Sequence, residues 1–238
     1  MTDRPLGATV PDFMPPPLPG PVLHGRFVEL QPLDPARHAE DLYLANRGHD
    51  ALWDYMPYGP FPDAAAYLSW QKSVAGKPDP FFYAICAVGT AKVQGIASFL
   101  RIDRANGVIE IGHIQIAPAF QRSPGSSEAL MLMIGWAFEQ GYRRVEWKCN
   151  ALNEASIRAA GRYGFSPEGT FRQHMIVKGR NRDSAWFSIL DKDWPLLRPV
   201  YAAWLAPGNF RSDGSQISRL SELTREALQA RGAADSRS

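Results

Sequence analysis

The chain has 238 residues, 45% of them hydrophobic, and its 26 Lys and Arg residues nearly balance its 24 Asp and Glu residues. A formal net charge of +2 gives no electrostatic reason to expect nucleic acid or a membrane surface as a general partner. The length suits one main domain with a substantial core, and the hydrophobic content excludes a chain that is disordered throughout.

The two cysteines, Cys86 and Cys149, are too few for a disulfide framework and lack the spacing of zinc ligands. The chain contains no run of about 18 apolar residues that would suggest a transmembrane helix. The N-terminus also lacks the apolar stretch of a secretion signal. We therefore expect a cytoplasmic protein without a metal site, whose partners are small or local.

The first 21 residues carry seven prolines, which favour an extended conformation without a hydrogen-bond ladder. We expect an arm that is either loose or laid over a neighbouring surface. A short strand is predicted over 26–33, and a helix follows over 34–48 with Asp34 as its N-cap.

A second helix is predicted over 62–76, with Asp63 as its N-cap. The segment between the two helices, residues 52–62, is rich in aromatic residues and proline. It either walls a binding cleft or roofs the core.

In the middle of the chain, the spacing of apolar residues changes from a period of two to a period of about 3.6 residues. Three strand-like runs joined by short turns predict an antiparallel meander, and one apolar helix then leads to a further strand. This connection has the length of a right-handed crossover, so the strands on either side of it should be parallel. The expected elements are strands at 81–88, 92–102 and 108–118, a helix at 128–141 and a strand at 143–150.

The last third predicts a short helix over 153–164, capped by Asn153, and then a hairpin over 169–190 that turns near 179–182. A further apolar helix is expected over 196–206. The final segment, 227–238, is expected to be frayed.

The segment Arg122-Ser-Pro-Gly125-Ser-Ser127 lies where the meander ends and the apolar helix begins. A helix N-terminus attracts anions, Gly125 permits close approach of a bulky group, and Arg122 adds a fixed positive charge. With the hydroxyls of Ser126 and Ser127, these groups suit a pyrophosphate. A serine-capped helix with one flexible glycine explains the same residues equally well. A Walker-type loop is excluded because no Gly-Lys-Ser/Thr follows.

Two separated motifs resemble the GNAT family of acetyl-CoA-dependent N-acetyltransferases. Residues 122–127 resemble the Arg/Gln-x-x-Gly-x-Gly/Ala loop that binds pyrophosphate in that family. Asn153-Glu-Ala-Ser156, followed by Gly164-Phe165, resembles the Asn-x-x-Ser…Gly-Phe helix of its RimJ/RimL-like branch of ribosomal-protein N-terminal acetyltransferases. The resemblance extends from about Gly25 to Asp191. It implies an α+β fold with a mostly antiparallel central sheet, a splayed parallel strand pair and flanking helices.

The resemblance also implies a site for acetyl-CoA and an amine acceptor, either a protein N-terminus or a small molecule. The main chain of Ile116 and Ala117 would contact the pantetheine arm, and Ser156 would lie near the sulfur. Ser127 stands where the family has Gly or Ala, and Pro124 stiffens the loop. We therefore expect the coenzyme to bind more weakly or in a different pose. The coenzyme-binding residues that it implies are Ile116, Ala117, Arg122, Ser123, Gly125, Ser126, Ser127, Asn153 and Ser156.

Transfer by direct attack needs a neutral amine and a proton for the departing thiolate. Glu110 is the first candidate for the base because its strand leads to the splay. His113 is the second, although strand alternation predicts that it lies on the opposite face.

The family frequently has a tyrosine as acid where this chain has Ala160. Ser156, Tyr163 or water must then supply the proton. Cys149 could instead form an acetyl-cysteine, but the sequence shows no obvious activating partner for it.

The hairpin tip carries Lys178, Arg180 and Arg182. It is either a solvated turn or a rim, extended by Arg172 and His174, that attracts an acidic substrate or steadies a partner subunit.

The expected organisation is a proline-rich arm over 1–21, an acetyltransferase domain over 22–194 and a helical extension with a frayed tail over 195–238. The arm and the apolar C-terminal helix could each cross to a second subunit in a homodimer. The alternative to an enzyme is a catalytically silent acyl-CoA-binding sensor or scaffold.

Overall fold

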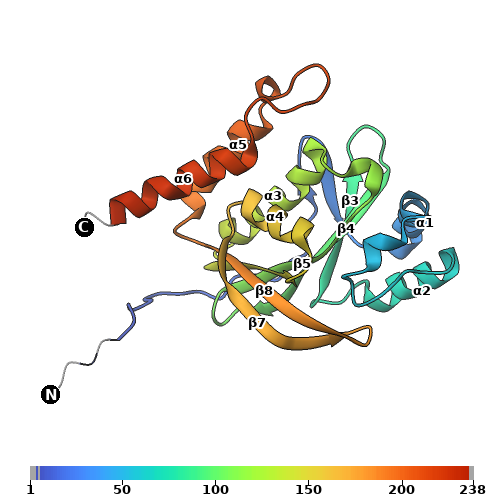
Figure 1. Ribbon diagram of the computed structural model, residues 1–238, viewed down its shortest axis with the longest axis horizontal. Coiled ribbons are helices and arrows are strands. Elements are labelled where there is room, and N and C mark those ends of the chain that lie inside the picture. Colours follow the sequence, from blue (N-terminus) through green and yellow to red (C-terminus); the bar gives the residue numbers. More distant parts are fainter. Residues whose placement is uncertain (1–3, 5, 236–238) are drawn as a thin grey trace.

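The computed structural model describes Arg4 and residues 6–235, and within this part of the chain eight strands form one sheet (Figure 1). The strand order is β1-β2-β3-β4-β5-β6-β8-β7, and every neighbouring pair is antiparallel except β5 and β6. The predicted α+β fold, with its single parallel pair, is therefore confirmed. The strands are β1 (Leu23–His24), β2 (Val28–Pro32), β3 (Phe81–Ala87), β4 (Val93–Asp103), β5 (Val108–Ile116), β6 (Arg144–Asn150), β7 (Ser166–Val177) and β8 (Arg180–Leu190).

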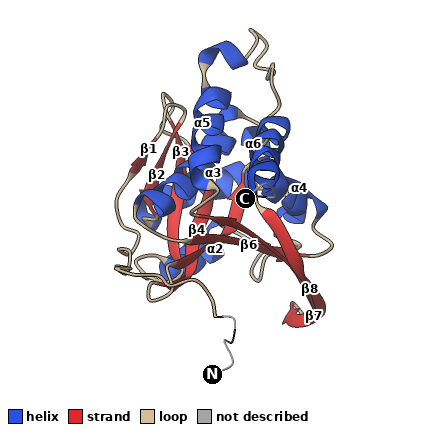
Figure 2. Cartoon of the chain, turned by 90° about the vertical axis from the view of Figure 1, so that its left-hand side faces the viewer, coloured by secondary structure: helices blue, strands red, loops and turns tan. Residues whose placement is uncertain are grey.

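Helices cover both faces of the sheet (Figures 1 and 2). The pair α1 and α2 packs on one face, whereas α3 and α4 cover the other, where α5 and α6 lie side by side against them. The helices are α1 (Pro35–Asn46), α2 (Ala64–Val74), α3 (Pro124–Glu139), α4 (Glu154–Arg162), α5 (Trp194–Leu205) and α6 (Leu220–Asp235), with short 3-10 turns η1 (Asp50–Trp53), η2 (Pro118–Phe120) and η3 (Pro207–Asn209).

The predicted N-caps form as expected. The carboxylate of Asp34 accepts a hydrogen bond from the backbone of Ala36 at 3.0 Å, and that of Asp63 accepts one from Ala66 at 2.8 Å. Each cap satisfies a backbone donor that has no partner inside its own helix. The two helices therefore begin where their local sequence indicates.

The parallel pair separates soon after it forms. Pairing between β5 and β6 runs from Val108 opposite Arg144 to Glu110 opposite Glu146. Beyond that point β5 continues beside β4 only, and β6 beside β8 only. A gap therefore opens in the middle of the sheet, after Glu110 and Glu146.

The proline-rich arm lies against its own chain. The hydroxyls of Tyr83 and Tyr142 donate to the carbonyls of Pro21 and Pro17 at 3.0 and 2.9 Å, and Arg104 Nε donates to the carbonyl of Pro16 at 2.6 Å. Of the two alternatives for the arm, residues 16–21 follow the second and are laid over a surface, which belongs to the same chain.

The C-terminal segment is more ordered than its sequence suggested. The frayed tail expected over 227–238 is wrong for the described part, because α6 continues to Asp235, and residues 236–238 lie outside the described residues. Thr224 of α6 donates through Oγ1 to the carbonyl of Arg162 at 3.3 Å, and Leu220 is fully buried. Docking against α4 and α5 thus stabilises a helix whose polar sequence would not hold it alone.

None of the helices described between residues 6 and 235 is sufficiently long and apolar to span a lipid bilayer.

Candidate functional site

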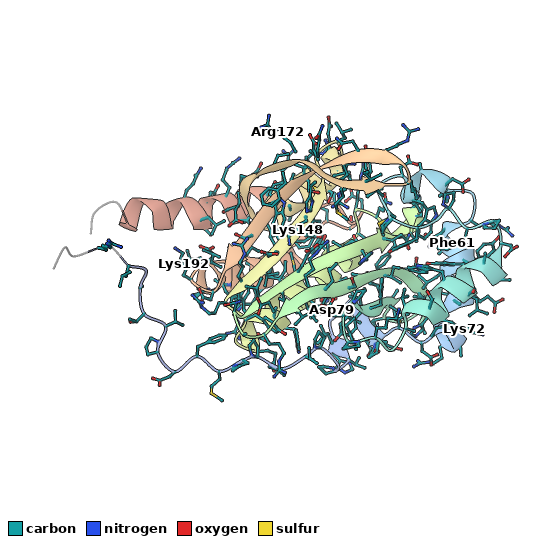
Figure 3. The ribbon with its side chains drawn as sticks, turned by 90° about the horizontal axis from the view of Figure 1, so that it is seen from below. Phe61, Lys72, Asp79, Lys148, Arg172 and Lys192 are labelled. Carbon is teal, nitrogen blue, oxygen red and sulfur yellow. The ribbon has the colours of Figure 1, made fainter. Side chains whose placement is uncertain are left out.

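A cavity of about 210 Å3 opens where β5 and β6 diverge. Figure 3 shows the sheet from the side opposite α3 and α4, with Lys148 near its middle and Arg172 on the β7–β8 hairpin. Loops, both diverging strands, α4 and this hairpin all contribute to the cavity wall. Among the residues that line it are Glu110, His113, Cys149, Asn153, Ser156 and Arg182. The structure thus brings together four residues that the sequence predicted for catalysis or coenzyme binding.

The two candidate bases lie on the same face of β5. Ile96 faces Gln115 and Ser98 faces Gly112, so two residues of β5, His113 and Ile114, oppose a single residue of β4. His113 has φ = 50°, in the left-handed region. This β-bulge interrupts the alternation of side chains. The expectation that His113 lies opposite Glu110 is therefore wrong, because it assumed an unbroken strand.

His113 is an uncharged imidazole at neutral pH. Burial, and then the positive charges of Arg101 and Arg182, lower the pKa of His113 to about 4. Its Nδ1 lies 3.2 Å from the hydroxyl of Tyr58, and its ring is stacked with the Tyr58 ring at 5.6 Å between centroids. The side chain can hold a polar group in place, but it binds a proton only weakly.

The lowered pKa of His113 makes the stability of the protein depend on pH. Because the unfolded state binds the proton more tightly, the contribution of His113 to the free energy of unfolding is fully present above pH 6.5. It is lost as the pH falls toward 4. We expect this group to remove up to about 3 kcal/mol of unfolding free energy over that range. Urea unfolding at pH 7, 5.5 and 4.5 measures the loss.

The control for this prediction is the variant His174→Asn, which changes an exposed histidine on β7. His113→Asn should flatten the decline in stability with falling pH, whereas His174→Asn should not. An identical pH slope in the wild type and in His113→Asn would refute the assignment.

Glu110 belongs to a row of alternating charges that we call the charge ladder. Its Oε2 accepts from Arg101 Nη1 at 2.7 Å and lies 3.1 Å from Lys148 Nζ, which also contacts Glu146 at 2.7 Å. Only 4% of the Glu110 side chain and 5% of the Lys148 side chain are exposed. Buried charges of this kind persist only when they are paired. The charge ladder consists of Arg101, Glu110, Lys148, Glu146, Arg144 and Glu168.

The charge ladder leaves one oxygen of Glu110 available. Both cations approach Oε2, and among the described residues no hydrogen bond reaches Oε1. The carboxylate is therefore fixed in orientation by its Oε2, while its Oε1 is free to accept a hydrogen bond. Sequence reasoning missed the partners Arg101 and Lys148, although the spacing of Arg144, Glu146 and Lys148 places all three on one face of a strand.

Ser156, which lines the same cavity, is positioned by two hydrogen bonds. Trp147 Nε1 donates to Ser156 Oγ at 2.9 Å, and Ser156 N donates to the side chain of Asn153 at 3.1 Å. Since Ser156 Oγ accepts from the indole, its own proton can be donated elsewhere. Asn153 caps the helix and also lines the cavity, and its contact with the coenzyme stays a prediction.

The other candidate donors and nucleophiles fit less well. Burial raises the pKa of the Cys149 thiol, which disfavours the thiolate that an acetyl-cysteine would need. The buried Tyr163 does not line the cavity, and its hydroxyl lies near Ser127 and Arg162. Of the side chains considered as proton donors, Ser156 is the one in the cavity.

The predicted anion site is the first turn of α3. The helix begins at Pro124, and Ser123 is its N-cap, accepting from Ser126 N at 3.0 Å. The hydroxyls of Ser126 and Ser127 both donate to the Ser123 carbonyl. The serine hydroxyls are thus turned inward, and the N–H groups of Ser126 and Ser127 are bonded to Ser123. Of the first-turn N–H groups, that of Gly125 remains for an anion, with arginines nearby.

Gly125 has a structural role that the sequence did not indicate. A Cβ at this position would lie 2.5 Å from Cζ of Phe120 and 3.2 Å from Cγ1 of Val28. The absence of a side chain lets the Phe120 ring pack over the helix start. Gly125 therefore shapes the turn through packing, whatever it also does for a ligand.

Arg162 supplies a second cation at the same turn, and sequence reasoning missed it. Its Nη1 donates to Ser127 Oγ at 2.9 Å, and its guanidinium lies 4.9 Å from the Trp204 ring centroid and 5.5 Å from that of Tyr163. Arg122, which precedes the N-cap Ser123, is exposed and has φ = 61°. The last turn of α4, the start of α3 and the end of α5 meet here only through tertiary packing, so no local pattern could have revealed it.

The two main-chain contacts predicted for the pantetheine arm differ in direction. Ala117 N donates to the carbonyl of Gln94 on the β4 side at 2.8 Å, so this N–H is already paired within the sheet. Successive residues of a strand direct their main-chain groups to opposite sides. Ile116 accordingly faces the gap, where its carbonyl accepts from Gln121 Nε2 at 3.1 Å.

Two hydrogen bonds tie the aromatic segment to the hairpin tip and to the loop before α4. Lys178 Nζ donates to the carbonyl of Trp53 at 2.7 Å, and the Tyr55 hydroxyl donates to the carbonyl of Leu152 at 3.1 Å. Trp53 itself is buried against α2, whereas Tyr55 lines the cavity. Both interpretations of residues 52–62 are therefore correct for different side chains.

Comparison with known proteins agrees with this architecture. The family described as "Acetyltransferase (GNAT) domain" matches residues 28–166. A crystal structure of a GCN5-related N-acetyltransferase from Brucella melitensis is 42% identical, with a TM-score of 0.88, over 91% of this chain and 100% of that one.

Two curated relatives are more distant. "Uncharacterized N-acetyltransferase p20" of Bacillus licheniformis is 29% identical over 59% of this chain and 80% of its own length. "Putative ribosomal N-acetyltransferase YdaF" of Bacillus subtilis is 32% identical over 42% of this chain and 55% of its own length. Because the family match spans more than half of the chain and carries the diverging strand pair, the protein belongs to the GNAT family of acetyltransferases.

Proposed function

We propose that the protein transfers an acetyl group from acetyl-CoA to a primary amine by direct attack of the amine on the thioester. The observation that carries the proposal is the cavity between β5 and β6, which joins a base candidate, Glu110, to a donor candidate, Ser156. The free cysteines, Cys86 and Cys149, support a reducing cytoplasm as the setting.

The coenzyme is proposed to run from the first turn of α3 into this gap. Its diphosphate would meet the N-terminus of α3, with Arg162 and Arg122 beside it. Its pantetheine arm would pair with the gap-facing main chain of Ile116, displacing the Gln121 amide. The thioester would then lie beside Ser156.

In the reaction the amine nitrogen bonds to the acetyl carbon, and the bond from that carbon to sulfur breaks. Glu110 Oε1 takes the proton that the nitrogen loses, directly or through water, and the Ser156 hydroxyl donates to the leaving thiolate. The neutral His113, fixed by Tyr58, accepts a hydrogen bond and orients the amine. The products are an N-acetyl amide and free coenzyme A.

A thiol-release assay tests the proposal. The protein is incubated with acetyl-CoA and a panel of amines and short peptides, and free thiol is followed while calorimetry measures coenzyme A binding. We expect both binding and amine-dependent release. Binding without release would favour the catalytically silent sensor, and absence of binding would remove both functions.

Removing the charge of Arg162 should weaken coenzyme A binding. Because the guanidinium is half-buried beside the helix start, Arg162→Met is expected to cost about 1–3 kcal/mol of binding free energy, with a smaller loss for the exposed Arg122→Ala. Isothermal calorimetry gives the dissociation constants. Arg158→Met is the control, since Arg158 lies on the same helix but pairs with Glu154 in solvent. Equal effects at positions 158 and 162 would contradict this placement of the diphosphate.

A further inference from the structure

The charged side chains that line the cavity differ in whether they form ion pairs. They are Arg101, Glu110, Lys148 and Arg182. The first three belong to the charge ladder, where every cation meets a carboxylate. Their charges therefore compensate one another inside the protein.

Arg182 has no such compensation. Its Nε donates to Ser184 Oγ at 3.1 Å, and no carboxylate of the described residues lies within ion-pair distance of it. The neighbouring Asp183 is engaged elsewhere, accepting from Gln173 N and Asn181 Nδ2 at 2.8 and 2.9 Å. A half-buried guanidinium is thus left facing the cavity, where burial lowers its pKa.

The position of Arg182 is close to the proposed reaction centre. The positive charge of Arg182 lowers the pKa of His113, and the Glu110 carboxylate raises the pKa of Arg182. The guanidinium therefore lies within electrostatic reach of both candidate bases. An incoming ammonium without an anionic group would place a second positive charge beside it. A carboxylate on the same molecule would instead form a charge-assisted, bidentate pair with the guanidinium.

The size of the cavity argues for a small acceptor. Its volume of about 210 Å3 falls below the roughly 300–1,000 Å3 of sites that hold drug-sized ligands. The hydrogen bonds from Lys178 to Trp53 and from Tyr55 to Leu152 hold the aromatic segment, which contributes Tyr55 to the cavity wall.

We infer that the acceptor is a small amine that carries a carboxylate a few atoms from its nitrogen, as an amino acid does, and that Arg182 binds this carboxylate. The inference rests on the proposed acetyl transfer and adds the chemical class of its acceptor. Glu110 and Arg182 then act on opposite ends of one zwitterion. The amine faces the carboxylate of the enzyme, and the acid faces the guanidinium.

Matched pairs of acceptors test this inference. Alanine, β-alanine and 4-aminobutyrate are each compared with the corresponding amide, which keeps the amine and removes the negative charge. Thiol release gives kcat/KM for each. We expect the acids to exceed their amides by roughly 10- to 100-fold, the effect of one charge-assisted hydrogen-bonded pair.

Variants at the hairpin separate recognition from stability. Arg182→Met should abolish the preference for acids and leave the amides within about twofold, whereas Arg182→Lys should restore part of it. Arg180→Gln changes an exposed arginine of the same hairpin that does not line the cavity, and it should alter nothing. The thermal midpoint of each variant reports whether it is folded.

Four outcomes would overturn the inference. Amides that react as fast as acids, or an equal loss for both classes in Arg182→Met, would remove the role of Arg182 while leaving acetyl transfer intact. A peptide that reacts faster than every free amino acid would overturn the small acceptor. Coenzyme binding without release for any amine would overturn the proposed function and this inference with it.

Discussion

Replacing Glu110 by glutamine is expected to lower kcat by roughly 10²- to 10⁴-fold, the range for loss of a general base. The amide keeps the size of the side chain but cannot take the proton of the amine at Oε1. Coenzyme A affinity should be unchanged, because β5 continues for six residues beyond Glu110 before the chain reaches α3, and Glu110 makes no hydrogen bond or ion pair with the first turn of that helix. Steady-state rates of thiol release and a calorimetric dissociation constant for coenzyme A measure the two quantities.

The matched control is Glu146→Gln. Glu146 also pairs with Lys148 in the charge ladder, but it does not line the cavity. Both variants leave a buried cation with one partner fewer, so both should lose stability. Only Glu110→Gln should lose turnover. A similar fall in kcat for both would mean that Glu110 acts by holding the charge ladder together rather than as a base.

Replacing Glu128 by alanine is expected to lower the free energy of unfolding by about 3–5 kcal/mol, because it leaves three backbone donors, one buried and two partly buried, without a partner. The Glu128 carboxylate, which is 4% exposed, accepts from the backbone N–H groups of Arg26, Phe27 and Val28 at 2.9, 2.6 and 3.0 Å. It thereby joins the beginning of β2 to the first turns of α3. Urea unfolding at pH 7 measures the change.

Two further variants check the cause. Glu139→Ala alters an exposed carboxylate at the end of the same helix and should change stability by less than about 0.5 kcal/mol. Glu128→Gln keeps an acceptor oxygen and should fall between the two. A loss below about 1 kcal/mol for Glu128→Ala would show that these three N–H groups find water or other partners.

The elements that the sequence predicted well are those set by local signals. Asp34 and Asp63 mark helix starts through hydrogen bonds to residues two or three positions ahead. The change of period after the meander indicated a crossover, and the parallel pairing of β5 with β6 follows from its length. Asn153 and Ser156 were found in the cavity because their motif lies on one short helix.

The features that the sequence did not predict depend on contacts between distant segments. The bulge at His113 arises from the pairing of β5 with β4, and one inserted residue moved a side chain to the other face. Arg162 meets Ser127 only because α4 packs beside α3. Arg182 looked like part of a solvated turn, and its burial becomes visible only when the hairpin folds over the gap.

The placement of Arg162 has a thermodynamic consequence for the C-terminal helices. The Arg162 guanidinium stacks on Trp204 of α5 and donates a hydrogen bond to Ser127 of α3. The backbone carbonyl of Arg162 accepts a hydrogen bond from the Thr224 hydroxyl of α6. The binding of a ligand that contacts this guanidinium is thermodynamically linked to the docking of α5 and α6. Thermodynamic coupling is reciprocal. If the docked helices raise the affinity for that ligand, the bound ligand stabilises the docking of those helices by the same free energy.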